Sequence, residues 1–172
     1  AIALFHHYDN DIAEEVSNLE DMVDHYEDEL GTYLMKLNNA DLSDADSKIV
    51  STILHCIGDF ERISDHAVNL MNTANEVYRK KEHFSDKAKG ELEVYEGAIR
   101  DIVSMTFSVF EKQDVAMATK VEPLEEVIDT LNDEVKKKHV KRLRKGKCTI
   151  ELGFVLSDIT TNFERIADHC SN

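Results

Sequence analysis

Residues 59–69 read DFERISDHAVN, and residues 162–172 read NFERIADHCSN; the two stretches share seven of eleven residues. Further upstream, residues 19–30 read LEDMVDHYEDEL and residues 124–135 read LEEVIDTLNDEV, with five of twelve residues in common. The offsets are 103 and 105 residues, and the order of the stretches is the same both times. Self-similarity of this kind indicates a repeated structural unit. The sequence therefore predicts a duplicated helical hairpin.

Apolar residues recur along the chain at alternating spacings of about four and three residues. This spacing places them on one face of an α-helix, so each series predicts an amphipathic helix with a buried seam. The predicted seams are Ile49, Ile53, Cys56, Phe60, Ile63, Ala67, Leu70, Ala74 and Val77; Ile12, Val16, Leu19, Val23, Tyr26, Leu30, Tyr33 and Leu37; Leu152, Leu156, Ile159, Phe163, Ile166 and Cys170; Leu92, Tyr95, Ile99, Ile102, Thr106 and Val109; and, more briefly, Leu124, Ile128, Leu131 and Val135.

Five helices are expected from these series and from the breaks between them. A polar segment at 38–46 separates the first two, and short polar residues that can cap a helix precede the others. The only proline, Pro123, is expected in a first turn or at a kink. The expected helices lie near 9–38, 44–81, 85–112, 114–145 and 149–172, with Ser43, Ser85, Asp114 and Thr149 as candidate caps.

Long helices joined by short loops are typical of antiparallel bundles. The predicted fold is all-α: one continuous, extended antiparallel bundle built from two repeats. The first repeat is assigned to residues 1–82 and the second to residues 83–172. The helix near 85–112 leads the second repeat, whereas the first repeat is expected to lack its leading helix.

The composition narrows the function classes. The 172 residues include 6 Gly and 1 Pro, too few turn formers for a sandwich or barrel, which needs a turn roughly every 8–12 residues. The net charge of −15 argues against nucleic-acid binding, because phosphodiester backbones would be repelled. No apolar run approaches the roughly 20 residues of a membrane span. Three widely spaced cysteines favour a reducing compartment.

Carboxylates spaced four residues apart occur twice in each repeat. Residues at this spacing share one helix face, where like charges destabilise an isolated helix. A hard cation would reverse that effect, because it prefers clustered carboxylate oxygens. If neighbouring helices bring the ladders together, one metal site per repeat is predicted; a solvated acidic face is the alternative. The ladders are Glu20-Asp24-Asp28 with Glu61-Asp65, and Glu125-Asp129-Asp133 with Glu164-Asp168.

Other charged residues have simpler interpretations. His66 and His169 follow the ladder aspartates directly and are expected at helix interfaces rather than as ligands. Arg62 and Arg165 can each pair with the aspartate three residues on. No Glu-x-x-His pair is present, which weakens a ferritin-like di-iron oxidase.

Two further segments carry ionisable residues. His6 and His7 are expected at the surface. Residues 136–147 contain eight Lys or Arg and no acid. These cations can complement a helix dipole, or they can form a docking patch for anionic lipid headgroups or for an acidic partner.

The duplicated F-E-R-I-x-D-H motif, each copy preceded by a helix with L-E-[DE]-x-x-D, resembles the PhoU family of phosphate-uptake regulators. The phrases HFSDKAKGELE (83–93), HVKRLRKGKC (139–148) and NFERIADHCSN (162–172) are most similar to the cytosolic C-terminal part of bacterial Na/Pi-cotransporter family proteins. The resemblance implies iron or zinc clusters held by carboxylates of both repeats. The residues implied are Glu20, Asp24, Glu61, Asp65, Glu125, Asp129, Glu164 and Asp168.

The resulting prediction is a non-catalytic regulatory domain linked to phosphate transport and homeostasis, at the cytoplasmic face of the membrane. The expected partners are the membrane domain of a phosphate transporter or a transport complex, and inorganic phosphate reached through bound metal. The sequence is also compatible with a homo-oligomer. Two alternatives remain: a carboxylate-bridged metalloenzyme, for which no general base stands out, and a metal-free helical scaffold.

Overall fold

The structure is a computed structural model that describes residues 1–38 and 42–172 of the chain. These residues form helices and no strand, so the all-α prediction is confirmed. Five long helices dominate the fold, together with a short 3-10 helix and a four-residue α-helix. The elements are η1 (Ile2–Phe5), α1 (Asn10–Asn38), α2 (Asp44–Lys80), α3 (Asp86–Lys112), α4 (Val115–Ala118), α5 (Val121–Arg144) and α6 (Ile150–Ser171).

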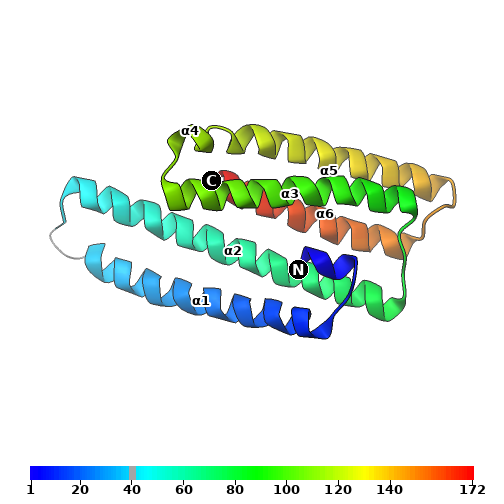
Figure 1. The fold of residues 1–172 in the computed structure, drawn as a ribbon, viewed down its shortest axis with the longest axis horizontal. Coiled ribbons are helices and arrows are strands. Elements are labelled where there is room, and N and C mark those ends of the chain that lie inside the picture. The colour runs from blue at the N-terminus through cyan, green and yellow to red at the C-terminus, as the bar shows by residue number, and fades with distance from the viewer. Residues whose placement is uncertain (39–41) are drawn as a thin grey trace.

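The helices form two antiparallel hairpins, α1 with α2 and α5 with α6 (Figure 1). α3 lies along the second hairpin and contacts both of its helices, while α2 and α6 pack against each other and join the hairpins. The extended antiparallel bundle is therefore confirmed. The predicted division between residues 82 and 83 falls in the connection between α2 and α3 and stays a prediction.

The main core lies where α3, α5 and α6 meet, and it reaches α2. Phe163 and Tyr95 are fully buried, with their rings edge-to-face at a centroid distance of 5.0 Å. Leu70 of α2 belongs to the same apolar cluster. Every position of the seam predicted for α6 is buried, because this helix is covered on several sides.

The helix starts follow the predicted capping chemistry. The side chain of Ser43 accepts a hydrogen bond from the Asp46 amide, and that of Ser85 accepts one from the Ala88 amide. Asp114 caps α4 and Thr149 caps α6 in the same way. Each cap satisfies an amide that has no partner inside its helix. Of the polar break predicted at 38–46, residues 39–41 lie outside the described residues.

The single helix predicted at 114–145 is wrong. α4 ends at Ala118, and α5 begins at Val121 after a turn. Pro123 explains the break, because its ring would clash with the carbonyl of Thr119 in a continuous helix. In the observed arrangement Pro123 is the third residue of α5, so its missing N–H falls where no intrahelical partner exists. The predicted first-turn position of this proline is confirmed.

No residue of the seam predicted for α1 is buried: Val16, Val23 and Leu37 are partly buried and the other five are exposed. The residues of α1 that are buried, Ala13 and Leu34, lie outside that series, and among the described elements α2 is the one helix that packs extensively on α1. The exposed members of the predicted seam are Ile12, Leu19, Tyr26, Leu30 and Tyr33.

The N-terminal residues form η1, which lies between α2 and α3 (Figure 1). Leu4 is buried against Ala13 of α1 and Met71 of α2. The periodicity of the sequence did not predict this element. Among the described helices, none combines the length and the apolar character needed to cross a bilayer.

Candidate functional site

The first acidic cluster consists of Glu20, Asp24, Glu61 and Asp65, at the seam between α1 and α2. Burial raises the pKa of Glu20, and the charges of neighbouring aspartates, including Asp65 across the seam, raise it further. The Asp65 carboxyl of α2 is thus close enough to Glu20 to raise its pKa. The structure therefore brings Glu20 and Asp65 together from two helices, while Asp24 stands one turn from Glu20 on α1.

Glu61 completes this cluster from α2. Burial raises its pKa, the charge of Asp65 adds to the rise, and the Arg62 guanidinium opposes it. Glu27 of α1 raises the pKa of Glu61 as well. Two carboxylates near Glu61, those of Asp65 and Glu27, thus disfavour its ionisation, which is the electrostatic condition under which a cation binds favourably.

The second acidic cluster consists of Glu125, Asp129, Glu164 and Asp168, at the seam between α5 and α6. Burial raises the pKa of Asp129, and the charges of Glu164 and Asp168 raise it further. Burial, followed by the charges of Asp129 and Asp168, raises the pKa of Glu125. The buried phenol of Tyr95 on α3 has a raised pKa for the same reasons. The four predicted carboxylates of this repeat are therefore near enough to influence one another electrostatically, Glu125 with Asp129 and Asp168, and Asp129 with Glu164 and Asp168.

Protein donors occupy part of the second cluster. Asn132 Nδ2 donates to Glu164 Oε2 at 2.8 Å, and Lys136 Nζ lies 3.5 Å from the same oxygen. Arg165 Nη1 donates to Asp168 Oδ2 at 3.1 Å, which confirms the predicted pairing in this repeat. The second cluster is therefore partly neutralised by the protein itself.

The two clusters differ because two aligned positions differ. At the offset of 105 residues, Glu27 in the first repeat replaces Asn132, and Gly31 replaces Lys136. The first cluster therefore has one more carboxylate and no equivalent of the lysine. No bond of Arg62 to Asp65 matches the Arg165 pair in the described part of the chain.

The donor chemistry suits a hard cation, since carboxylate oxygens are its preferred ligands. In the side-chain positions observed, however, no three His, Cys, Asp or Glu residues among those described are grouped closely enough to hold a metal ion. Most of these carboxylates are at least partly accessible on flexible stems. Metal ligation by the eight predicted residues stays a prediction.

The predicted interface positions of two histidines are observed between α2 and α6. His66 Nδ1 donates to Asn162 Oδ1 at 2.8 Å, and His169 Nδ1 donates to Asp59 Oδ1 at 2.9 Å. The two imidazole rings stack with centroids 5.9 Å apart. In each repeat, the residue directly before the F-E-R-I motif thus accepts a hydrogen bond from the histidine of the other repeat. The spacing of residues in the sequence does not reveal this role.

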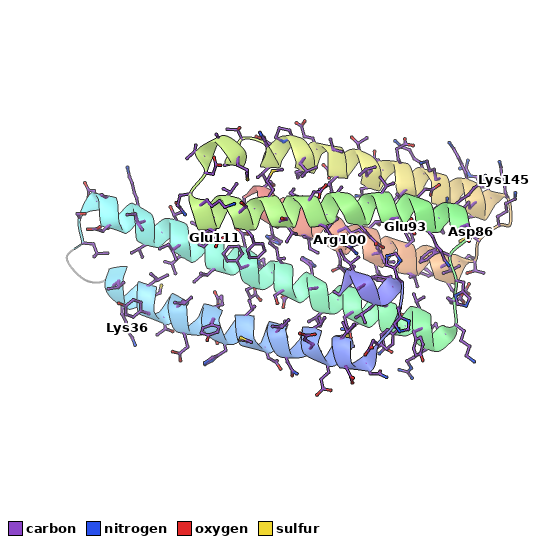
Figure 2. All side chains as sticks on the ribbon, viewed as in Figure 1. Lys36, Asp86, Glu93, Arg100, Glu111 and Lys145 are labelled. Carbon is purple, nitrogen blue, oxygen red and sulfur yellow. The ribbon has the colours of Figure 1, made fainter. Side chains whose placement is uncertain are left out.

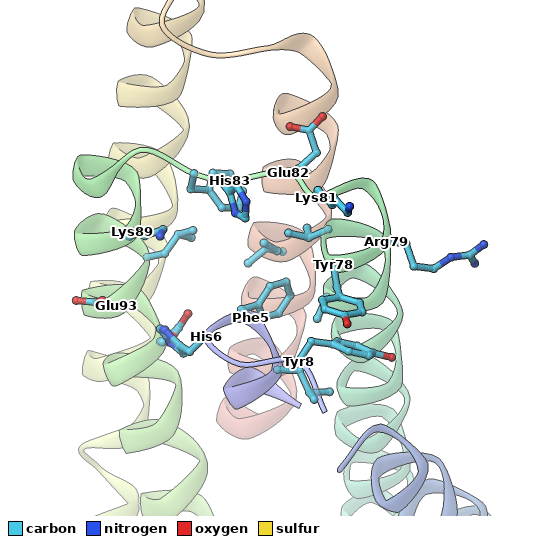
Figure 3. Close-up of a pocket in the computed structure, with 17 residues that line it drawn as sticks. Phe5, His6, Tyr8, Tyr78, Arg79, Lys81, Glu82, His83, Lys89 and Glu93 are labelled. Carbon is cyan, nitrogen blue, oxygen red and sulfur yellow. The ribbon is translucent and has the colours of Figure 1, made fainter. Parts of the chain in front are cut away.

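A cavity of about 790 Å³ lies between η1, the end of α2 and the start of α3 (Figure 3). His6 Nε2 lies 2.7 Å from Oε2 of the buried Glu96, and the rings of Tyr8 and Tyr78 stack at 4.7 Å. His6 is exposed, as expected, and in addition pairs with a buried carboxylate. Its partner is 90 residues away, and no motif in the sequence indicates the pairing.

The basic run at 136–147 covers the end of α5 and the following loop. Arg142 turns inward and pairs with Glu91 of α3 at 2.6 Å. Figure 2 shows Lys145 at the end of the bundle, near the start of α3. Lys138, Lys141 and Lys147 are likewise exposed, so a cationic surface remains after the internal pairs are formed.

Comparisons with known proteins agree with this architecture. A protein described as a phosphate-specific transport system accessory protein PhoU homolog 1, from Thermotoga maritima, is 28% identical over 125 residues, covering 73% of this chain and 53% of the relative. The chain thus spans about half the length of that relative. The crystal structure of PhoU from Pseudomonas aeruginosa superposes with a TM-score of 0.89 at 19% identity, covering 99% of this chain and 81% of that one, and shows a shared fold.

The family comparison covers both hairpins. The family model described as the PhoU domain matches residues 1–74 and 96–172, which leaves out only the segment from the end of α2 to the first part of α3. Both acidic clusters and both F-E-R-I motifs lie inside the matched ranges. On this match, the chain belongs to the PhoU domain family.

Proposed function

We propose that this domain regulates phosphate transport without catalysing a reaction, as the cytosolic PhoU-like part of a Na/Pi-cotransporter-like protein. The observation that carries the proposal is the duplicated hairpin with the PhoU fold and family match. The name of the Thermotoga relative, an accessory protein of phosphate-specific transport, supports the link to transport. The phrases at 83–93, 139–148 and 162–172 support the narrower cotransporter assignment.

The regulatory signal in this proposal is a metal ion held between the helices of a hairpin. Raised pKa values in both acidic clusters support it, because a cation would relieve the repulsion that causes part of the rise. After rotation of their side chains, the ligands would be the carboxylates of the two clusters: Glu20, Asp24, Glu61 and Asp65 in the first repeat, and Glu125, Asp129, Glu164 and Asp168 in the second. The resemblance to the family suggests iron or zinc as the metal.

Inorganic phosphate would then be bound through the metal. A protein with a net charge of −15 repels a phosphate dianion, whereas a bound cation supplies a local positive charge with open coordination positions. The proposal therefore expects phosphate to bind only when metal is present. A metalloenzyme or a bare helical scaffold would behave differently in the same experiments.

The metal proposal is tested by elemental analysis of protein purified without chelator, and by titration of the metal-free protein with Fe²⁺ and Zn²⁺. The doubly substituted E61A/D65A protein is expected to lose binding to the first cluster. A matched control, D101A/E111A, removes two exposed acids of α3 and should bind metal as the unchanged protein does. Binding unaffected by E61A/D65A would favour the scaffold, and metal-dependent turnover would favour the enzyme.

The membrane link has two tests. Several apolar runs of roughly 20 residues upstream in the same reading frame would support the cotransporter assignment. Vesicles containing anionic lipid should bind the protein through the exposed basic run, and neutralising Lys136, Lys137, Lys138 and Lys141 together should abolish binding. Unchanged vesicle binding by that variant would reject the lipid contact while leaving the metal proposal intact.

A further inference from the structure

Positive charge gathers at one end of the bundle, although the chain as a whole has a net charge of −15. Residues 79–89 and 136–147 contain 13 of the 20 Lys and Arg residues but only 2 of the 35 Asp and Glu residues. The first segment covers the end of α2, the connection to α3 and the start of α3, and the second covers the end of α5 and the following loop. Figure 1 shows both connections at the same end of the bundle.

Most of these cations have no acidic partner. Arg142 pairs with Glu91 of α3, which holds the end of α5 against the start of α3, and three lysines pair with acids of α2, α5 and α6. Among the described residues, the other nine Lys and Arg of the two segments are exposed and form no ion pair. We call these nine the cationic end: Arg79, Lys81, Lys87, Lys89, Lys138, Lys141, Arg144, Lys145 and Lys147.

The helix dipole accounts for only part of this charge. Cations in the last turns of α2 and α5 complement the partial negative charge of a helix C-terminus. Lys87 and Lys89, however, are among the first four residues of α3, where the dipole disfavours a cation. These two lysines add positive charge to the surface without stabilising their helix, which indicates an anionic partner outside the protein.

Two large apolar side chains are exposed next to the cationic loop. Ile150 is the first residue of α6 and is 68% exposed. Phe154 lies one turn further along the same face and is 69% exposed. Both closely follow Lys147 in the chain. Apolar side chains bordered by cations are typical of surfaces that bind an anionic membrane, because they can enter the boundary between headgroups and acyl chains.

The kind of cation favours a bilayer over an acidic protein. Seven of the nine residues are lysines, which are hydrated point charges on flexible stems, whereas Arg is the side chain that binds carboxylates with a fixed bidentate geometry. Charges spread over two segments suit a plane of many headgroups, and each Lys or Arg near that plane adds to the attraction. The acids of the other surfaces would be repelled by the same plane, so the bundle would stand on this end.

We propose that the cationic end docks the domain end-on against a bilayer containing anionic phospholipid, with Ile150 and Phe154 entering the headgroup layer. This inference deepens the membrane link of the proposed function and rests on it for the nearness of a membrane. It adds the segment 79–89 as a second contact, an orientation of the bundle, and two inserted side chains. The acidic clusters have no part in it.

The contribution of the second segment is tested by sedimentation with vesicles of phosphatidylcholine containing about one-third phosphatidylglycerol. The K87Q/K89Q variant should bind roughly tenfold more weakly, or less, than the unchanged protein, because it lacks two cations near the lipid surface. The matched control, K36Q/K48Q, neutralises two exposed lysines at the other end of the bundle and should bind normally (Figures 1 and 2). Circular dichroism checks that both variants keep the helical fold.

Insertion is tested with tryptophan, which the chain lacks. On addition of the same vesicles, the fluorescence of F154W should shift to shorter wavelength, and lipids with brominated acyl chains should quench it. The control, V115W, carries the reporter at a residue of α4 that is 78% exposed and lies at the opposite end of the second hairpin (Figure 1). V115W should bind the vesicles while showing neither effect.

Three results would overturn the proposal. Normal vesicle binding by K87Q/K89Q would leave the lipid contact to residues 136–147 alone, which keeps the proposed membrane link and rejects end-on docking. Vesicle binding without a spectral shift of F154W would reject insertion. Failure of the unchanged protein to bind vesicles would reject the lipid partner, and binding of polyglutamate would then assign the cationic end to an acidic protein. The metal titration is independent of all three results, so regulation by metal can fail while this proposal stands.

Discussion

Carboxylates in the first acidic cluster oppose folding at neutral pH as long as no cation is bound. The pKa of Glu61 is raised above its ordinary value of 4.5, chiefly by burial and then by the charge of Asp65. The folded protein therefore binds more protons than the unfolded chain in the range just above pH 4.5. Its free energy of unfolding falls as the pH rises through the raised value.

Substituting Glu61 by Gln should thus stabilise the metal-free protein at pH 7, by about 0.2–0.5 kcal/mol, the size of a like-charge helix pair. The gain should disappear near pH 3, well below the ordinary pKa of 4.5, where the carboxyl is protonated in both the folded and the unfolded state. Urea unfolding in the presence of chelator, at both pH values, measures the difference. The control is Glu93→Gln, which changes an exposed acid of α3 outside the clusters. An equal gain in stability there would show that the effect at Glu61 does not come from its neighbours in the cluster.

The histidine interface gives a second prediction for single residues. Asp59 Oδ1 accepts hydrogen bonds from His169 and from Asn172, at 2.9 and 3.2 Å. Asp59→Ala should lower the free energy of unfolding by roughly 1.5–3 kcal/mol, because a charged carboxylate is a strong hydrogen-bond acceptor. Asn162→Ala removes a neutral amide from His66 and should lower it by roughly 0.5–1.5 kcal/mol. Asp59→Asn keeps an acceptor and should cost less than Asp59→Ala. An Asn162→Ala cost as large as that of Asp59→Ala would contradict this ranking.

At the scale of the helices, two equivalent positions of α1 and α5, Leu30 and Val135, can be compared by replacing each side chain with alanine. Val135 is 3% exposed beneath α3, so Val135→Ala should cost roughly 1.5–2 kcal/mol from two buried methyl groups. Leu30, its counterpart on α1, is 44% exposed to solvent, so Leu30→Ala should change the free energy of unfolding by less than about 0.5 kcal/mol. Urea unfolding measures both. A large cost at Leu30 would show that something covers α1 in solution.

The contrast between these helices also shows what the sequence could predict. Ser43, Ser85, Asp114 and Thr149 were identified as caps because capping is local, and the spacing of apolar residues located every long helix. Spacing cannot say how many neighbours a helix has, so the α1 seam was expected to be as buried as that of α6. Pro123 also indicates a first turn, and the clash of its ring with the preceding turn is the physical reason why α4 and α5 are separate helices.

The acidic clusters show the same limit at the scale of the site. The i,i+4 spacing predicted ladders on single helices, and the duplication predicted that they recur. Contacts across the seams depend on which helices are adjacent and on their register, which no spacing encodes. The donors Asn132 and Lys136 on Glu164 were missed for this reason, and so was the binding of His66 by Asn162.

In the whole molecule, most of the buried apolar residues lie where α3, α5 and α6 meet, and α2 joins this core at the α2–α6 interface. Leu70 of α2 shares one apolar cluster with Phe163 of α6 and Tyr95 of α3. The stacked imidazoles of His66 and His169 lie in the same α2–α6 interface. α2, α3, α5 and α6 should therefore unfold together, although the sequence repeats itself. α1 is attached to this unit chiefly through α2.

This arrangement predicts that α1 opens before the rest of the molecule. With few buried apolar contacts and a dense run of acids, its amides should exchange with deuterium at least tenfold faster than those of α6, because the free energy of local opening is smaller. Hydrogen exchange followed by mass spectrometry compares peptides from 19–33 with peptides from 155–168. Bound cation at the first cluster should slow exchange in α1 selectively, since it would tie Glu20 to Glu61 and Asp65. If α1 without metal is as protected as α6, then a partner, a second copy or an additional segment covers α1, and the predicted order of opening is wrong.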